Sequence, residues 1–292
     1  MNLRAPLGTL LTVCAWLTAS PAVADGHPPL WRIDGRHNSV YLLASVHVLR
    51  ATDDALSEPV LRAYKAANAL YMEVDLDDLD PEAAGQFTME HGVLPEEQTL
   101  RDILGPERYG TAHQQALDLG LDLDQFAQLE PWVVAITIAQ MQFAKLGLDP
   151  GAGVEQRLME RAKQDGKAIA GLETLADQLS ALDSLPMKLQ GEFLLVSLDE
   201  ASDMEQEADQ LINAWARGDT TALARTLVHD FDKFPELYRS LIVDRNRKWA
   251  DEIGALLDDD ANYLIVVGAL HLVGQDSVIE LLRAHGHPAQ RQ

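Results

Sequence analysis

Two stretches of this sequence decide the fold, Val40-Tyr-Leu-Leu-Ala44-Ser-Val-His47 and Tyr263-Leu-Ile-Val-Val-Gly268-Ala-Leu-His271. Each is an apolar run that reaches a small residue, followed by two further residues and a histidine. Continuous apolar runs predict strands buried on both faces, and ligands of open α/β sheets bind beyond the carboxyl ends of such strands. Because the two stretches lie near opposite ends of the chain, only the fold can bring His47 and His271 together. We expect them to share one site.

Strands and helices alternate along the rest of the chain. Residues 31–33 and 40–46 predict a hairpin, and further strands are predicted at 69–74 and 167–172. Helical stretches separate these strands, the longest over residues 81–165. Parallel neighbours need crossover connections, so this order predicts an α/β fold with a mixed β-sheet, flanking helices and a large helical insertion.

The first 24 residues have the order of a secretory signal peptide. Arg4 precedes an apolar run from Leu7 to Leu17, and Ala22-Val-Ala24 matches the cleavage pattern of small residues. The run is too short to cross a membrane. The alternative is a buried N-terminal helix. We expect residues 1–24 to be a signal peptide and 25–292 to be a single domain, in a bacterial protein that is periplasmic or secreted.

Charge and cysteine content narrow the class of protein. The formal net charge of −23 disfavours binding to nucleic acid or to anionic lipid. We therefore expect no nucleic-acid partner, and no membrane partner once the signal peptide is removed. The only cysteine, Cys14, lies in the predicted signal peptide, so the mature chain has neither a disulfide framework nor a zinc-thiolate site.

Two glutamates occupy unusual places beside predicted strands. Glu73 lies inside the apolar strand 69–74, and Glu173 directly follows the strand that ends at Leu172. Carboxylates in such places are rarely buried without a cation or a hydrogen-bond partner. Two simpler interpretations stay open: Glu73 faces outward on an edge strand, and Glu173 only caps the helix that begins at Thr174.

Arg245 lies on the apolar face of a helix predicted over residues 236–257. At roughly 100° per residue it falls in the middle of the arc that Leu241, Trp249 and Ile253 form. A buried guanidinium needs a carboxylate, a phosphate or a substrate oxyanion, and its planar fork suits a bidentate partner. The alternative is that its stem snorkels to a polar rim.

Two histidines, two carboxylates and a buried arginine are the groups of a metal site with nitrogen and oxygen ligands and an anion stabiliser. Such ligands suit a divalent Mn, Co, Fe or Zn ion. An ion with open positions lowers the pKa of a bound water and polarises a carbonyl, so hydrolysis is the reaction that this set serves best. The histidines in turns, on helix surfaces and near the tail, His113 among them, are expected to be solvated.

Further short motifs extend in order over the chain after residue 29. They are Leu30-Trp-Arg-Ile-Asp-Gly35, Met72-Glu-Val-Asp75, Glu130-Pro-Trp132, Gly171-Leu-Glu173, Ala214-Trp-Ala-Arg-Gly-Asp219, Arg245-Asn-Arg-Lys-Trp249 and Val267-Gly-Ala-Leu-His-Leu-Val-Gly274. With the His47 stretch, this series resembles the TraB/GumN family, which is related to the Tiki metalloproteases. The motifs are specific for the family and much less so for any activity.

The resemblance implies a metal-dependent site made by paired Gly-x-x-His motifs with a glutamate and an arginine, which cleaves peptides in the Tiki proteins. By this resemblance His47 and His271 are metal ligands. Glu73 is a ligand or a general base, and Arg245 clamps the substrate or an oxyanion.

Four other positions bear on the resemblance. Glu155 and Glu173 match acidic positions of the family and are additional candidates for the site. The chain departs from the pattern at Ala44, where the first motif normally has glycine, and at Glu130, where lysine is expected before Pro-Trp. Alanine is a small change unless the backbone there needs a positive φ.

Three classes of function follow. The first, which we favour, is an exported metal-dependent hydrolase that acts on peptides or another small substrate. The second is a non-catalytic protein that sequesters a peptide or small ligand on the same scaffold, as TraB-type proteins of pheromone systems do; a related scaffold also binds haem. The third is a structural or interaction protein whose polar core residues are merely satisfied.

Overall fold

The computed structural model describes residues 26–292 except 79–80, 202–203, 230 and 232–233. The predicted signal peptide lies outside the described residues, and the division at residue 24 stays a prediction. Among the described helices, none is both long and apolar enough to cross a lipid bilayer.

The described strands form one six-stranded mixed sheet with the order β4-β3-β5-β2-β1-β6. Strands β4, β3, β5 and β2 are parallel to one another, whereas β1 pairs antiparallel with β2 and with β6. The α/β fold class is therefore confirmed. The strands are β1 Leu30–Asp34, β2 Ser39–Ser45, β3 Ala69–Val74, β4 Ala168–Glu173, β5 Tyr263–Gly268 and β6 Gln290–Arg291.

The two stretches that carry the histidine motifs are neighbouring parallel strands. β2 and β5 pair so that Ser45 lies opposite Gly268, and both strands are almost completely buried. Their carboxyl ends therefore meet at one edge of the sheet. No described residue other than glycine has a positive φ, so Ala44 occupies the place of the motif glycine without strain.

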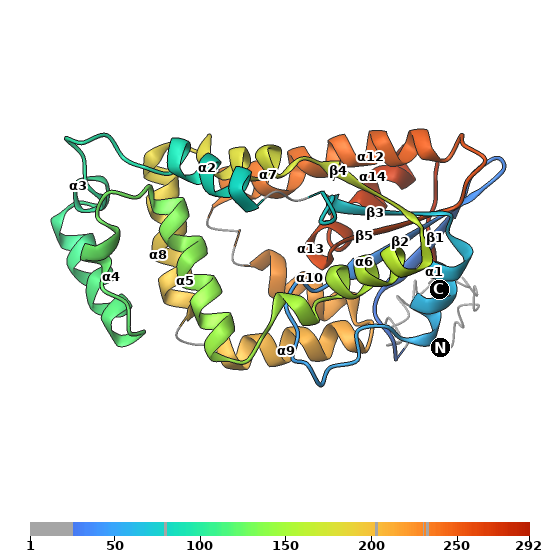
Figure 1. Cartoon of the computed structure of the whole chain (residues 1–292), viewed down its shortest axis with the longest axis horizontal. Coiled ribbons are helices and arrows are strands. Elements are labelled where there is room, and N and C mark those ends of the chain that lie inside the picture. Colours follow the sequence, from blue (N-terminus) through green and yellow to red (C-terminus); the bar gives the residue numbers. More distant parts are fainter. Residues whose placement is uncertain (1–25, 79–80, 202–203, 230, 232–233) are drawn as a thin grey trace, which may run out of the picture.

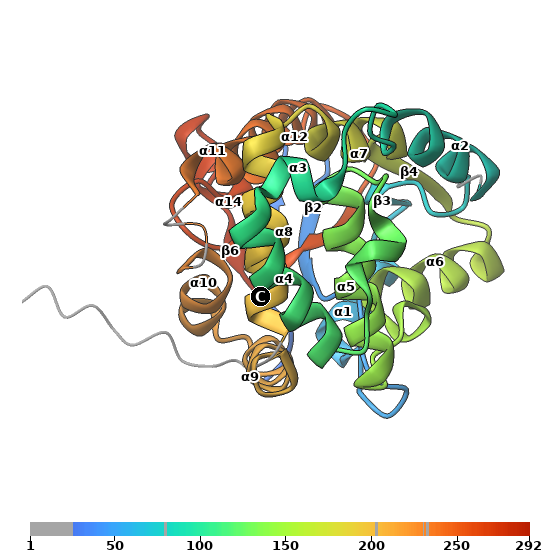
Figure 2. The same cartoon turned by 90° about the vertical axis from the view of Figure 1, so that its left-hand side faces the viewer.

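Helices cover both faces of the sheet. Figures 1 and 2 show α12 and α14 on one side and α1 and α6 on the other. Apolar residues of these helices and of the strands share the main core, which includes Leu158, Trp249, Val278 and Leu264. The covering helices are α1 Glu58–Ala66, α6 Val154–Asp165, α12 Asp244–Leu256 and α14 Val278–Ala284.

A helical insertion extends from one end of the sheet, on the left of Figure 1, and has an apolar core of its own. Leu100, Ala112, Ile138 and Leu194 from four different helices belong to that core. We define the helical insertion by α3 Leu100–Leu104, α4 Pro106–Asp118, η1 Leu123–Phe126, α5 Pro131–Lys145 and α8 Met187–Ala201. The predicted insertion is thus confirmed, with a contribution from α8, which follows β4.

The remaining described helices belong neither to the helical insertion nor to the four helices named above that cover the sheet. They are α2 Pro81–His91, η2 Pro150–Ala152, α7 Leu175–Asp183, α9 Met204–Ala216, α10 Thr220–His229, α11 Pro235–Tyr238 and α13 Ala269–Leu272. The single helix predicted over 236–257 is interrupted, because a π-helical turn at Arg239–Val243 separates α11 from α12. Such turns are frequent at functional sites, and this one leads directly into Arg245.

Candidate metal centre at the sheet edge

The sheet edge brings His47, Glu73 and His271 together. His47 follows β2, Glu73 is the second-last residue of β3, and His271 lies in the one-turn helix α13 after β5. The Nε2 atoms of His47 and His271 lie 3.9 and 3.8 Å from Glu73 Oε1. One carboxylate oxygen therefore faces both predicted histidine ligands.

Glu73 is buried in the interior of the sheet, so the interpretation as an outward-facing edge residue is wrong. β3 lies between β4 and β5, and Glu73 is 7% exposed. Its Oε1 accepts a hydrogen bond from the Gly268 amide at 2.7 Å, and its Oε2 accepts one from Gln178 at 3.3 Å. Burial raises the pKa of the Glu73 carboxyl, but the charges of His47 and Arg245 and the Gly268 N–H bring it below its ordinary value.

Arg245 joins Glu73 to Glu173. Its Nη2 donates to Glu73 Oε2 and to Glu173 Oε1, both at 2.7 Å, and its Nε donates to Glu173 Oε2 at 3.1 Å. Nη1 donates to the Leu241 carbonyl at 3.0 Å and approaches His271 Nε2 at 3.3 Å. All five N–H donors of the guanidinium are thus engaged within the protein.

The contacts of Arg245 and Glu173 rule out the two simpler interpretations that the sequence left open for these residues. The Arg245 side chain is 13% exposed and its guanidinium lies 4.7 Å from the ring of Trp249, so it does not snorkel to solvent. Helix α7 is capped by Thr174 and Asp177, so Glu173 is not the cap. Burial raises the pKa of Glu173 even though it pairs with Arg245.

His47 is held from one side by Glu155. Its Nδ1 lies 2.8 Å from Glu155 Oε1, which also accepts a hydrogen bond from the Ser45 hydroxyl. Glu155 is in the first turn of α6, where the helix dipole favours a carboxylate. Glu155 and then Glu73 raise the pKa of His47 to about 10, although 63% of the side chain is exposed.

A glycine lets α6 approach His47. A Cβ on Gly153, the N-cap of α6, would lie 2.2 Å from the His47 carbonyl oxygen. Only glycine therefore permits this distance between the backbones. The close approach is what places Glu155 beside the histidine.

His271 is held by Asn246, which the sequence analysis did not identify. Its Nδ1 lies 2.6 Å from Asn246 Oδ1, and Asn246 Nδ2 donates to the Asp276 carbonyl at 2.8 Å. Burial and the nearby Arg245 lower the pKa of His271 to about 3. Asn246 is fully buried, but it directly follows Arg245 at the border of the apolar arc, where a neutral amide gives no signal in the sequence.

Two observations bear on whether these groups fit a metal ion. A Cβ on Gly268 would lie 3.0 Å from His47 Nε2 and 3.1 Å from Glu73 Oε1, so the motif glycine keeps the space between the donors open. Glu155 Oε2 is buried and has no hydrogen-bond partner, although buried carboxylate oxygens normally have one. The donor set and the vacant space both fit a small divalent cation.

The arrangement still requires one movement. Among the described residues, only His113, Asp122 and Asp124 place three ligand atoms within 4.8 Å of one another. Glu73 is within 4 Å of both histidines, so it is the two imidazole nitrogens that lie farther apart. Zinc bonds of about 2.0 to 2.2 Å hold two ligands within about 4.4 Å, so the exposed His47 ring must turn inward.

A cavity of about 240 Å³ opens beside these groups. Apolar side chains of Val74, Leu76 and Pro150 line it together with the amides of Gln156 and Gln178. His47, Glu73 and Glu155 contribute its polar wall. His47 and Glu73 therefore line a cleft with both apolar and amide walls, whereas His271 lies buried behind them.

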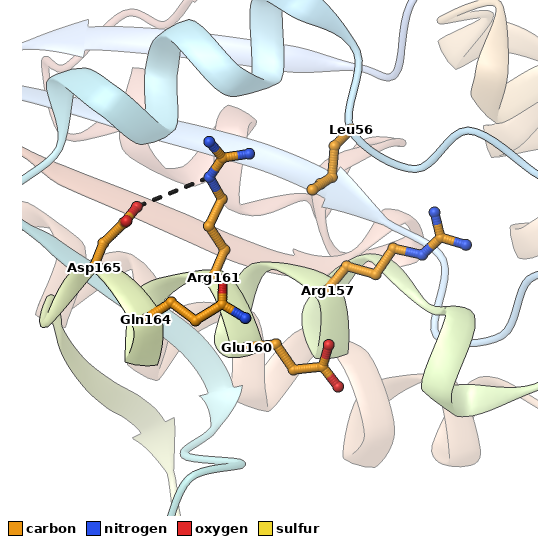
Figure 3. Close-up of a pocket in the computed structure, with 6 residues that line it drawn as sticks. All are labelled: Leu56, Arg157, Glu160, Arg161, Gln164 and Asp165. Atoms are coloured by element: carbon orange, nitrogen blue, oxygen red, sulfur yellow. Dashed lines mark ion pairs between the residues drawn. The ribbon is translucent and has the colours of Figure 1, made fainter.

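A second hollow, of about 420 Å³, lies elsewhere along α6 and contains none of the candidate ligands (Figure 3). Arg161 faces Asp165 across it at 3.8 Å and also lies over the Tyr64 ring. The charges of Arg161 and Asp165 are thus paired with each other. The lining residues are Leu56, Arg157, Glu160, Arg161, Gln164 and Asp165.

The chain belongs to the TraB/PrgY/gumN family, whose model matches residues 29–291. This match confirms the family resemblance seen in the sequence and covers the whole sheet and the helical insertion.

Several bacterial relatives are similar over most of the chain. The uncharacterized protein YbaP of Shigella flexneri is 27% identical over 249 residues, which are 85% of this chain and 88% of YbaP. YbaP of Escherichia coli is also 27% identical, over 83% of this chain and 87% of its own length. An uncharacterized protein of Treponema pallidum is 26% identical over 87% of this chain and 79% of its own. No solved structure shows significant similarity to this chain.

Proposed function

We propose that this protein is an exported, metal-dependent hydrolase that acts on peptides, with His47, Glu73 and His271 as the metal ligands. The observation that carries the proposal is that both Nε2 atoms face one oxygen of Glu73, at 3.9 and 3.8 Å, while both Nδ1 atoms are held by other residues. Metal-binding histidines characteristically have the second ring nitrogen held in this way.

In this proposal each residue of the site has a separate role. A divalent ion bound here would polarise a substrate carbonyl and acidify a bound water. Glu73 keeps a free lone pair on Oε1, because the Gly268 amide occupies only one of its two. Glu155 lines the cavity and holds His47 Nδ1 through its Oε1, so it would orient that ring toward the ion. Arg245 fixes Glu73 in place.

The cleft suits a peptide chemically. Apolar walls at Val74, Leu76 and Pro150 accept side chains, while the amides of Gln156 and Gln178 can bond to a peptide backbone. We propose Mn, Co, Fe or Zn as the ion, since nitrogen and carboxylate ligands serve all four. The periplasmic or secreted location rests on the Ala22-Val-Ala24 cleavage pattern, and N-terminal sequencing of exported protein tests it.

One observation favours the second candidate, a protein that binds and sequesters a peptide or small ligand. Four N–H groups of Arg245 are bonded to Glu73, Glu173 and Leu241, and the fifth is directed at His271 Nε2, so no guanidinium donor points toward an oxyanion in the cleft. This supports a positioning role for Arg245 in place of the clamp implied by the family resemblance.

The deciding experiment combines metal stoichiometry with peptide turnover. Purified mature protein is stripped with a chelator, dialysed against each of the four ions and incubated with a peptide library, and cleavage is followed by mass spectrometry. The proposal expects one ion per chain and cleavage that depends on it. If one ion binds and peptide is retained without cleavage, the protein is the sequestering protein. If no ion binds, the proposed metal site is wrong.

A further inference from the structure

We infer that Asn246 is the positioning residue that fixes the tautomer of His271, so that the lone pair stays on Nε2, the ring nitrogen nearest Glu73. The inference rests on the proposed function for its purpose, but its geometry is independent of any bound ion. No part of the family resemblance assigns a role to this asparagine.

The direction of the Asn246 side chain is set by the backbone. Asn246 Nδ2 lies 2.8 Å from the Asp276 carbonyl oxygen, which can only accept a hydrogen bond. The amide group must therefore point its NH₂ toward Asp276 and its oxygen toward His271. Asn246 is 0% exposed, so no water competes for either end.

The direction of Asn246 in turn sets the proton on His271. Asn246 Oδ1 lies 2.6 Å from His271 Nδ1 and can only accept, so Nδ1 carries the proton. On the other side of the ring, Arg245 Nη1 approaches Nε2 at 3.3 Å and can only donate, so Nε2 carries the lone pair. Two contacts on opposite sides of the imidazole thus require the same tautomer.

Packing holds the ring in this orientation. The indole of Trp249 lies against His271 with ring centroids 4.4 Å apart, and the histidine is 4% exposed. Asn246 and Trp249 belong to the same helix, α12, one turn apart. One helix therefore fixes both the plane and the protonation of the histidine, as outer-shell partners do at metal sites.

The test compares two substitutions that break the same bond to Asp276. Asn246→Ala removes the acceptor for His271 Nδ1, whereas Asn246→Asp keeps an oxygen there. A merely structural asparagine predicts the same result for both. A tautomer-setting asparagine predicts that only Asn246→Ala releases the proton from Nδ1.

The primary readout is the long-range ¹H–¹⁵N spectrum of metal-free protein labelled in histidine, with His271 assigned from a His271→Gln sample. We expect the Nδ1–H tautomer in the wild type and in Asn246→Asp, and a shift toward Nε2–H in Asn246→Ala. Asn262→Ala is the matched control, because Asn262 also bonds to the backbone at both ends of its amide but far from His271. It should leave the tautomer unchanged.

The second readout is zinc affinity by calorimetry, which we expect to fall 10- to 100-fold in Asn246→Ala and less in Asn246→Asp. An Nε2–H tautomer in the wild type overturns the inference even if neither variant folds. Equal spectra for Asn246→Ala and the wild type overturn it as well. The expected tautomers without zinc binding uphold the role of Asn246 and contradict the proposed metal function instead.

Discussion

Two regions of this molecule gather histidine and carboxylate groups, and they differ in how the chain assembles them. At the sheet edge, His47, Glu73 and His271 come from three strand ends far apart in the sequence. In the helical insertion, His113, Asp122 and Asp124 come from one short segment, with the His113 and Asp122 side chains 28% and 43% exposed. Ligand atoms lie closer together in the second group, yet the first is the better candidate.

The reason lies in what each group already does. Asp122 caps η1 by accepting from the Asp124 amide and pairs with His113 at 3.0 Å, while Asp124 accepts from the Tyr109 hydroxyl at 2.6 Å. These bonds explain the local group as a helix cap. The sheet-edge group buries Glu73 at a desolvation cost and leaves Glu155 Oε2 without a partner. Short distances between ligand atoms therefore indicate a metal site less well than buried polar groups that have no structural role.

Arg245→Lys is expected to give the largest difference in stability between a substitution at the sheet edge and one in the helical insertion. A single ammonium cannot bridge Glu73 and Glu173, so one buried carboxylate loses its partner, and we expect the free energy of unfolding to fall by about 3 kcal/mol or more. Chemical denaturation measures this. Lys188→Met in the helical insertion is the control, since Lys188 is 84% exposed and 4.0 Å from Glu192, and should cost less than about 0.5 kcal/mol. Unchanged stability with lost turnover would restore the clamp role of Arg245.

Metal affinity should separate the two histidine groups directly. His47→Ala removes a proposed ligand, so we expect zinc affinity to fall more than about 100-fold, and the melting temperature to fall as well because the buried Glu155 loses its partner. His113→Ala should leave zinc affinity unchanged. Calorimetric titration of both variants measures the difference. Loss of zinc binding in His113→Ala alone would transfer the metal site to the helical insertion.

The sequence predicted the sheet edge better than the helical insertion, for a physical reason. Strand residues alternate faces and end at a common edge, so apolar runs such as 263–268 indicate where the following histidine lies. The shared pattern led us to expect one site for the two histidines, and the structure shows in addition that β2 and β5 are paired neighbours. Helix contacts in the insertion depend on packing between segments, and the contribution of α8 had no local signal.

Within the site, the sequence revealed residues of unusual chemistry and missed those of ordinary chemistry. A glutamate in an apolar strand and an arginine on an apolar face stand out, because their burial is costly. Asn246 and Gln178 do not, since a neutral amide is common on any helix. The π-helical turn before Arg245 was also not predicted, because the apolar positions on both sides of it were assigned to one regular helix. His113, which was expected to be solvated, is 28% exposed and pairs with Asp122 at 3.0 Å.

The two motif glycine positions offer a smaller test at the sheet edge. A Cβ in Gly268→Ala would occupy the space 3.0 Å from His47 Nε2 and 3.1 Å from Glu73 Oε1, so we expect zinc affinity to fall about 10-fold, comparable with the loss of an outer-shell partner. Ala44→Gly, at the equivalent position of the first motif, should leave affinity unchanged. Equal affinities for both variants, measured by the same titration, would mean that no ion occupies the space beside Gly268.

The smallest effect is expected in the helical insertion, at Glu130. This carboxyl is 8% exposed at the start of α5, and its Oε2 accepts from Trp132 Nε1 at 3.1 Å and from Gln190 Nε2 at 3.0 Å. Burial, together with the nearby Asp183, raises its pKa despite these bonds. Because the folded pKa exceeds the unfolded one, this group favours folding at low pH and opposes it as the pH rises through the folded pKa.

Glu130→Gln should therefore stabilise the protein at pH 7 and lose its advantage below about pH 4.5, where the carboxyl is protonated in both states. We expect a gain of at most about 1 kcal/mol, or ~2–4 °C in melting temperature. Glu96→Gln, at an exposed position of the same half of the chain, is the control and should change nothing. A melting temperature for Glu130→Gln that falls at pH 7, or rises equally at pH 4 and pH 7, would show that the charge of Glu130 does not oppose folding. The helical insertion would then, like the sheet edge, contain a buried carboxylate that its surroundings stabilise.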